Sequence, residues 1–151
     1  MFNVTSKEEK IIANTTCKQY SYNSKEGKFY YSSNDKIYEA DLKTGIKKYV
    51  ADGYDPEISS DDNILAYTYW VDSTCHIIVT NLSTGEVWKR VMRPYGFVLS
   101  PDGEYLLIRR AGTGIDFRLF YNEETVIYDY KNKKELEIVG HGSCDFVLDW
   151  I

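Results

Sequence analysis

Short apolar runs separated by polar turns recur along the whole chain and favour strands over helices. Three runs that follow a polar turn are rich in aromatic and β-branched side chains, which suit a pleated sheet. Three later runs alternate apolar and polar positions, as expected of a half-exposed outer strand. The first set is residues 28–32, 64–70 and 104–109, and the second set is residues 46–50, 86–91 and 134–139. The 14 Tyr, 6 Phe and 3 Trp residues agree with an all-β chain.

Two kinds of turn punctuate these runs, and each occurs three times. The first turn leads into the aromatic strands and lies within residues 21–27, 57–63 and 97–103. The second turn belongs to a later hairpin, within residues 37–45, 77–85 and 126–133. Asp or Asn opens each second turn, because its side chain accepts a hydrogen bond from the backbone two residues on. Gly45 and Gly85 supply the positive φ that closes a tight reversal.

The spacing of the copies matches a four-stranded unit. Ser24 to Ser60 is 60 − 24 = 36 residues, Ser60 to Ser100 is 100 − 60 = 40, and Gly45 to Gly85 is 85 − 45 = 40. Repeats of roughly 40 residues are typical of propeller blades. We predict one propeller-like domain over residues 1–151, with blades at 20–52, 53–92 and 93–140 and a long loop at 110–123 in the third.

The two ends of the chain extend the pattern. Residues 141–151 begin the repeat once more as a closing strand, and residues 1–19 can be laid over an outer strand without its blade. The two ends could therefore pair and close a small ring. A helix over residues 6–13 is the alternative for the N-terminal segment, because Ser6 and Glu9 fit a capping box.

The segment Ser100-Pro101-Asp102-Gly103, followed by the turn at Asp129, resembles the TolB-type propeller repeat. Residues 41–45 and 81–85 match that family's second turn, whereas residues 60–63 lack the proline of its first turn. The resemblance covers residues 20–151 and implies an incomplete or small β-propeller of about three to four antiparallel four-stranded blades. Members of the family usually close six or seven blades into a ring that binds proteins or gates a peptidase. This chain supplies half as many.

Length, charge and cysteine spacing narrow the functional classes. At 151 residues the chain fits one domain, and no window approaches 18 unbroken apolar residues. The net charge of −5 argues against nucleic acid or anionic lipid as a partner and favours a basic protein. Cys17, Cys75 and Cys144 lie far apart, which predicts free thiols in a reducing cytoplasm. The N-terminus shows no secretion signal.

The few residues that could carry chemistry lack the spacing that catalysis or metal binding requires. Cys75 adjoins His76, and Cys144 lies near His141, but neither pair has a third group that would orient the base. The spacings typical of zinc sites are also missing. We therefore predict no catalytic residue, no metal site and no cofactor, with these side chains serving packing or turns.

Two groups of residues are candidates for binding a partner. The acidic stretch contains Asp55, Glu57, Asp61 and Asp62, which are either solvated turn residues, the interpretation favoured by the repeat, or charges for a basic partner. The long loop mixes arginine and aromatic residues, a composition enriched in binding hot spots. The candidates in and beside that loop are Arg110, Asp116, Phe117, Arg118, Phe120 and Tyr121, with Trp70 and Asp72 at the equivalent connection of the second blade. The loop could instead simply lengthen a hairpin.

These observations favour a non-enzymatic protein-binding module. An immunity protein that neutralises a basic toxin, such as a nuclease, would suit its size and charge. One alternative is a partial propeller domain of a larger TolB-like or peptidase-associated assembly. Another is a carbohydrate-binding or hydrolytic propeller that uses the acidic stretch together with Trp70 or Trp88. Exposed edge strands could also pair two copies as a homodimer.

Overall fold

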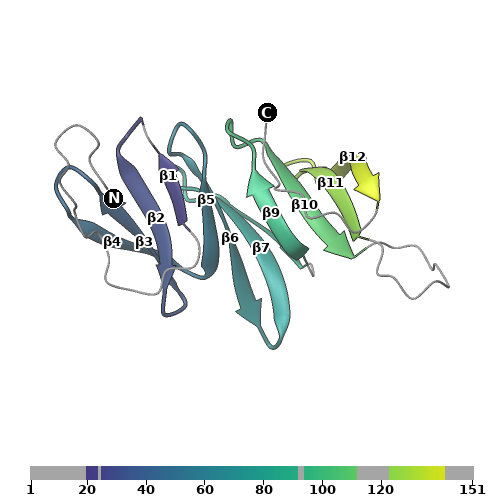
Figure 1. Ribbon diagram of the computed structural model, residues 1–151, viewed down its shortest axis with the longest axis horizontal. Helices are drawn as coiled ribbons and strands as arrows, with labels where there is room; N and C mark the ends of the chain where they lie inside the picture. The colour runs from purple at the N-terminus through teal and green to yellow at the C-terminus, as the bar shows by residue number, and fades with distance from the viewer. Residues whose placement is uncertain (1–19, 24, 92–93, 112–122, 142–151) are drawn as a thin grey trace.

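The computed structural model describes residues 20–23, 25–91, 94–111 and 123–141, and these residues form twelve β-strands in three sheets. Each sheet has four antiparallel strands that follow one another in chain order. The three sheets lie side by side in the order of the sequence (Figure 1). The described residues include no helix. The prediction of an all-β chain built from four-stranded units is confirmed.

The strands of each sheet run from an inner first strand to an outer fourth strand. The first sheet contains β1 (Tyr20–Asn23), β2 (Lys28–Ser33), β3 (Lys36–Asp41) and β4 (Lys47–Asp52). The second contains β5 (Tyr54–Ile58), β6 (Ile64–Val71), β7 (Thr74–Asn81) and β8 (Val87–Val91). The third contains β9 (Pro94–Leu99), β10 (Tyr105–Ala111), β11 (Glu123–Asp129) and β12 (Lys134–His141). Strand β5 contacts β1, β2 and β9, so the first strands of the three sheets lie together.

The second turns have the geometry that their sequence predicts. Oδ1 of Asp41 accepts hydrogen bonds from the backbone N–H groups of Lys43 and Thr44 over 2.8 and 2.9 Å. Oδ1 of Asn81 accepts hydrogen bonds from the backbone N–H groups of Ser83 and Thr84, over 2.9 Å each. Gly45 and Gly85 have φ values of 76° and 74°, a conformation that glycine adopts without steric cost.

The first turns repeat with a different alignment from the predicted one. The backbone N–H of Ser59 donates to the carbonyl of Ile64, and that of Ser100 donates to Tyr105, each over 2.9 Å. In the first sheet, Asn23 lies opposite Lys28, which is also five positions on. The predicted equivalence of Ser60 with Ser100 is therefore wrong by one residue, and the true spacing is 100 − 59 = 41. The tandem serines at 59 and 60 conceal which one opens the turn.

The third sheet also differs from the prediction at its long connection. Strand β10 reaches Ala111, and β11 begins at Glu123. Arg110 therefore belongs to a strand, where it pairs with Glu124, and not to a loop. The arginine is held there by carboxylates on neighbouring strands, a cause that the local sequence does not reveal.

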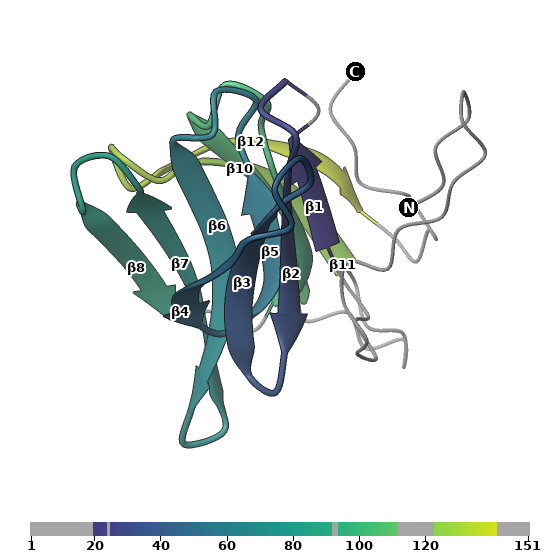
Figure 2. The ribbon, with the colours of Figure 1, turned by 90° about the vertical axis from the view of Figure 1, so that its left-hand side faces the viewer.

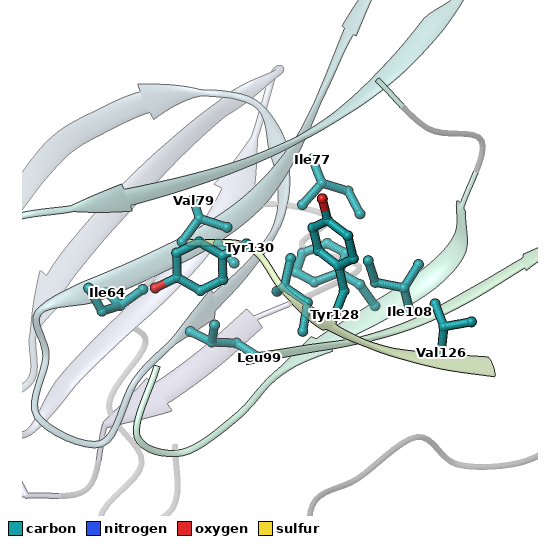
Figure 3. Close-up of a cluster of buried hydrophobic side chains, with 11 residues drawn as sticks. Ile64, Ile77, Val79, Leu99, Ile108, Val126, Tyr128 and Tyr130 are labelled. Atoms are coloured by element: carbon teal, nitrogen blue, oxygen red, sulfur yellow. The ribbon is translucent and has the colours of Figure 1, made fainter. Parts of the chain in front are cut away.

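Two apolar layers hold the sheets together. Figure 2 views the row of sheets from the side of the first sheet. Between the first and second sheets, Tyr30, Ile37 and Leu65 are fully buried. Between the second and third sheets, Ile77 and Val79 of β7 point toward Tyr128 and Tyr130 (Figure 3). Each buried side chain of this size contributes about 1.5–3 kcal/mol to stability, so packing between sheets dominates the fold. The second sheet is covered on both faces.

Candidate binding groove

A groove of about 370 Å³ lies where the first strands of the three sheets end. All three sheets contribute to its wall, together with the first turn that follows each strand. Its lining residues are Tyr22, Asn23 and Lys25 of the first sheet, residues 57–61 of the second, and Val98, Leu99 and Pro101 of the third. The repeat therefore builds the groove by bringing three copies of one turn together.

Hydrogen bonds between neighbouring turns fix the floor of this groove. The side-chain amide of Asn23 donates to the carbonyl of Ser60 over 3.3 Å. The backbone N–H of Ser60 in turn donates to the carbonyl of Pro101 over 2.8 Å. The backbone N–H of Ile58 donates to the hydroxyl of Ser21 over 3.1 Å. Because these bonds join three sheets, the groove has a defined shape before any ligand binds.

Asp61 lines the groove and also holds its own turn. The hydroxyl of Ser59 donates to the Asp61 carboxylate over 2.6 Å, and Asn63 donates from its backbone and its side chain. These hydrogen bonds, that of Ser59 first, lower the pKa of Asp61. Ser100 and Asp102 repeat the arrangement in the third sheet over 2.6 Å. Asp61 is thus ionised and oriented at neutral pH.

Asp62 points away from the groove into the junction of the first two sheets. Its side chain is only 6% exposed and forms an ion pair with Lys28. The hydroxyl of Tyr30 lies 2.9 Å from carboxylate oxygens of both Asp62 and Glu39. The hydrogen bond with Asp62 raises the pKa of Lys28, and burial together with the same carboxylates raises that of Tyr30.

The predicted acidic stretch is divided between two parts of the second sheet. Glu57 and Asp61 line the groove, whereas Asp55 lies near the start of β5, beside the middle of β6. The hydroxyl of Thr68 donates to Asp55 over 3.1 Å, and burial raises the pKa of this carboxyl. The stretch is continuous in sequence, but it does not form one acidic patch.

The remaining predicted residues lie elsewhere. Trp70 is 55% exposed at the end of β6, and Asp72 follows it in the hairpin that leads to β7. Arg110 forms ion pairs with Glu124 over 3.3 Å and with Glu135 over 2.6 Å. The other predicted loop residues, Asp116, Phe117, Arg118, Phe120 and Tyr121, lie outside the described residues.

Sequence reasoning missed the groove residues Tyr22, Lys25 and Pro101. Tyr22 is 45% exposed although it belongs to a strand, and it lines the groove together with Lys25. A signal for these positions was available, since each lies in or beside a copy of the first turn. The first strands of neighbouring blades lie closest to one another, so residues at their ends meet.

A second cavity of about 500 Å³ opens between the outer parts of the second and third sheets. Its lining includes Trp88, Tyr130, Glu86, Lys131 and Lys133. The Trp88 ring centroid lies 5.5 Å from that of Tyr130 and equally far from that of a neighbouring tyrosine, Tyr128. An aromatic wall with charged groups at its edge is thus present there.

Within the described part of the chain, no group of three or more His, Cys, Asp or Glu side chains is placed to hold a metal ion. Over the same residues, no helix has the length and apolar character needed to cross a membrane.

Comparison with known proteins finds similarity in structure alone. No family model matches the sequence, and no curated protein matches it. The β-propeller domain of the Trilobed protease from Pyrococcus furiosus superposes on 84% of this chain with a TM-score of 0.63 and 16% identity. The tricorn protease matches 85% of this chain with a TM-score of 0.61 and 14% identity. The WD40 domain of SCAP from fission yeast matches 89% of this chain with a TM-score of 0.52 and 10% identity.

The chain folds as part of a β-propeller. The propeller fold that the turn motifs predict is confirmed, and at these identities the likeness establishes the fold alone. The chain spans 42% of the Trilobed protease domain and of the WD40 domain, and 15% of the tricorn protease. Each four-stranded sheet is therefore a propeller blade, and the groove lies at the inner ends of three blades.

Proposed function

We propose that this propeller segment is a non-enzymatic binding module that holds an extended peptide of a partner protein in the groove. The observation that carries the proposal is the construction of the groove from the same turn of all three blades, with hydrogen bonds between the turns. A preformed site loses less entropy on binding than one that must be ordered first.

The groove has the chemistry of a peptide site. The exposed ring of Tyr22 offers an apolar and hydrogen-bonding anchor, and tyrosine is enriched among residues that dominate interface energies. Lys25, Glu57 and Asp61 place both signs of charge around the groove. Two carboxylates against one ammonium favour a peptide with basic side chains, in agreement with the net charge of −5.

An inhibitor of a basic toxin is a narrower form of this proposal. It rests on size and charge alone, as does the choice of a nuclease as its target. A cytoplasmic location stays a prediction from the cysteine spacing. Cys75, one of the three cysteines, is buried as a free thiol, and burial raises its pKa.

The experiment is a selection of random peptides displayed on phage against the whole 151-residue chain. The affinity of a selected synthetic peptide is then measured by fluorescence anisotropy for the wild type and for Tyr22→Ala, Lys25→Glu and Trp70→Ala. We expect Tyr22→Ala to weaken binding at least tenfold, about 1.4 kcal/mol, because it removes the anchor. Trp70→Ala is the matched control, since Trp70 is an exposed aromatic residue outside the groove.

The two aromatic variants distinguish the groove from the hairpin at Trp70. If binding is lost in Trp70→Ala and kept in Tyr22→Ala, the groove is not the site and the hairpin predicted from sequence takes its place. Circular dichroism checks that both variants remain folded, which is expected because both side chains are exposed.

Carbohydrate binding is a second candidate, and the cavity beside Trp88 is the observation that favours it. Tryptophan and tyrosine rings can stack on the apolar faces of sugar rings while charged groups bind hydroxyls. We expect quenching of tryptophan fluorescence by an oligosaccharide only in variants that retain Trp88. Unchanged quenching in Trp88→Phe would exclude this cavity.

A further inference from the structure

Two exposed side chains of opposite charge line the groove at equivalent positions of neighbouring blades. The first turns open at Asn23 and Ser59, and both 25 − 23 and 61 − 59 equal 2. Lys25 of the first blade is therefore equivalent to Asp61 of the second. Both residues are exposed and belong to the groove wall. A ligand that crosses these two blades thus meets an ammonium group and then a carboxylate.

Asn23 fixes the position of Lys25 relative to the second turn. Its Oδ1 accepts a hydrogen bond from the backbone N–H of Lys25 over 3.0 Å, and its side-chain amide donates to the carbonyl of Ser60 over 3.3 Å. One side chain therefore joins the two turns. Among the described residues, the ammonium group of Lys25 forms no ion pair, so its charge is available to a ligand.

Asp61 keeps acceptor capacity for a ligand although it holds its own turn. Its Oδ1 accepts hydrogen bonds from the hydroxyl of Ser59 and the backbone N–H of Asn63, and its Oδ2 accepts one from the side-chain amide of Asn63. A carboxylate offers about four acceptor sites, so these three bonds leave one for a cationic side chain. The same bonds hold the carboxylate in one orientation.

The third blade makes its end of the groove apolar. Within the described part of the chain, its contribution to the groove wall is Val98, Leu99 and Pro101. Leu99 is only 5% exposed, whereas Pro101 is exposed. The carbonyl of Pro101 accepts a hydrogen bond from the backbone N–H of Ser60, which places this proline directly beside the second turn. An apolar side chain of a ligand can bury its surface against the proline ring.

We propose that the groove recognises the order of side chains along the peptide, with an acidic side chain at Lys25, a basic one at Asp61 and an apolar one at Pro101. This inference rests on the proposed function, because it specifies the peptide that the groove holds. The order follows from the blades, which lie side by side in sequence order (Figure 1). Hydrogen bonds from the second turn to the first and to the third place it between them.

The geometry of an extended chain sets the spacing of the recognised side chains. Alternate side chains of an extended peptide point the same way, so the three positions are i, i+2 and i+4. A peptide with the two charged side chains exchanged would place like charges together at both Lys25 and Asp61. Like charges that face each other across an interface select against a partner. The groove therefore distinguishes peptides of the same composition by their order.

The test compares peptides of one composition in a common flanking sequence, with serine at the intervening positions. One pair has the basic residue in the middle, as Asp-Ser-Lys-Ser-Leu and its reverse, and the other pair has the acidic residue there, as Lys-Ser-Asp-Ser-Leu and its reverse. The reversed sequences cover both directions in which a peptide can lie. We expect one of the peptides with a central lysine to bind the whole chain at least about tenfold tighter than both peptides with a central aspartate. Affinities are measured by fluorescence anisotropy at low salt.

The variant Lys25→Glu should reverse the preference at the first position. In the direction of the tighter wild-type peptide, we expect this variant to prefer lysine over aspartate at the end of the motif that faces residue 25. Lys89→Glu makes the same change of charge at an exposed lysine of β8 outside the groove, so it is the matched control that keeps the wild-type preference. An unchanged preference in Lys25→Glu would overturn the role of Lys25.

The outcomes separate this inference from the proposed function. If peptides selected on phage bind in the groove but all the ordered peptides bind equally well, recognition of order is overturned and the groove remains a peptide site. If neither the selected nor the ordered peptides bind, the proposed function and this inference are both overturned. Circular dichroism checks that Lys25→Glu is folded, which is expected because Lys25 is exposed.

Discussion

Asp62 and Gly103 occupy the same position in successive first turns, and both have a positive φ, of 64° and 72°. Asp62 uses the position to send a carboxylate into the junction of the first and second blades, where it binds Lys28 and Tyr30. Gly103 leaves the equivalent space to Ile64, whose nearest atom lies 2.7 Å from where a Cβ would stand. One junction is therefore tied by charge and the next by apolar packing.

Replacing Asp62 with Asn tests the charged junction. The amide tolerates a positive φ but removes the charge that pairs with Lys28, so we expect a loss of about 1–3 kcal/mol in the free energy of unfolding, measured with urea. Asp72→Asn is the matched control, because Asp72 also has a positive φ, of 47°, and is exposed. A loss of equal size in both variants would show that backbone conformation, and not the ion pair, sets the cost.

Replacing Gly103 with Ala tests the apolar junction. A methyl group there would meet Cγ1 and Cβ of Ile64 at 2.7 and 2.9 Å. Gly85 has a similar φ, of 74°, and a Cβ added there would meet no atom within 4 Å. The variant Gly85→Ala therefore measures the backbone cost alone, about 1 kcal/mol. We expect Gly103→Ala to cost about 1–3 kcal/mol more than that control. In an Ile64→Ala background, which lacks Cγ1, Gly103→Ala should cost less, and an unchanged cost there would contradict the contact.

The serine-aspartate turn of the third blade should stabilise the protein less at low pH. Hydrogen bonds from Ser100 and from the backbone of Glu104 lower the pKa of Asp102. A lowered folded-state pKa means that the stabilisation is present above the unfolded value of 3.8 and is lost as the pH falls through the folded value. Asp102→Asn should therefore be less stable than the wild type at pH 7, by about 0.5 kcal/mol for an exposed group. Denaturant unfolding at several pH values should show this gap closing toward pH 2. A gap that does not change with pH would contradict the assignment.

The sequence predicts the repeat and its turns well, because Asx turns and glycines act locally. It predicts the orientation of strands poorly where a blade is covered on both sides. Residues 75–79 of β7 are all buried, so no alternation of apolar and polar residues tells which side chain faces which neighbour. The role of Arg110 is hidden for a related reason, since Glu135 approaches it from a strand 25 residues away.

Arg110 provides a direct check of that structural role. Its guanidinium pairs with Glu124, whose side chain is buried, and with Glu135, which also binds Arg90. We expect Arg110→Ala to lower the free energy of unfolding by about 2–4 kcal/mol, because a buried carboxylate loses a charged partner. Arg110→Ala should leave the affinity for a groove-bound peptide unchanged. A stable variant with weakened peptide binding would instead support the binding role predicted from sequence.

If the three first turns together form the binding site, an NMR titration will locate a bound peptide at all three. The ¹⁵N-labelled chain is titrated with a peptide selected on the wild type, and amide shift changes are followed residue by residue. We expect the largest changes at residues 22–25, 57–61 and 98–103, which include the groove residues of all three blades. Changes confined to the hairpin at residues 70–74, with the first turns unaffected, would contradict it.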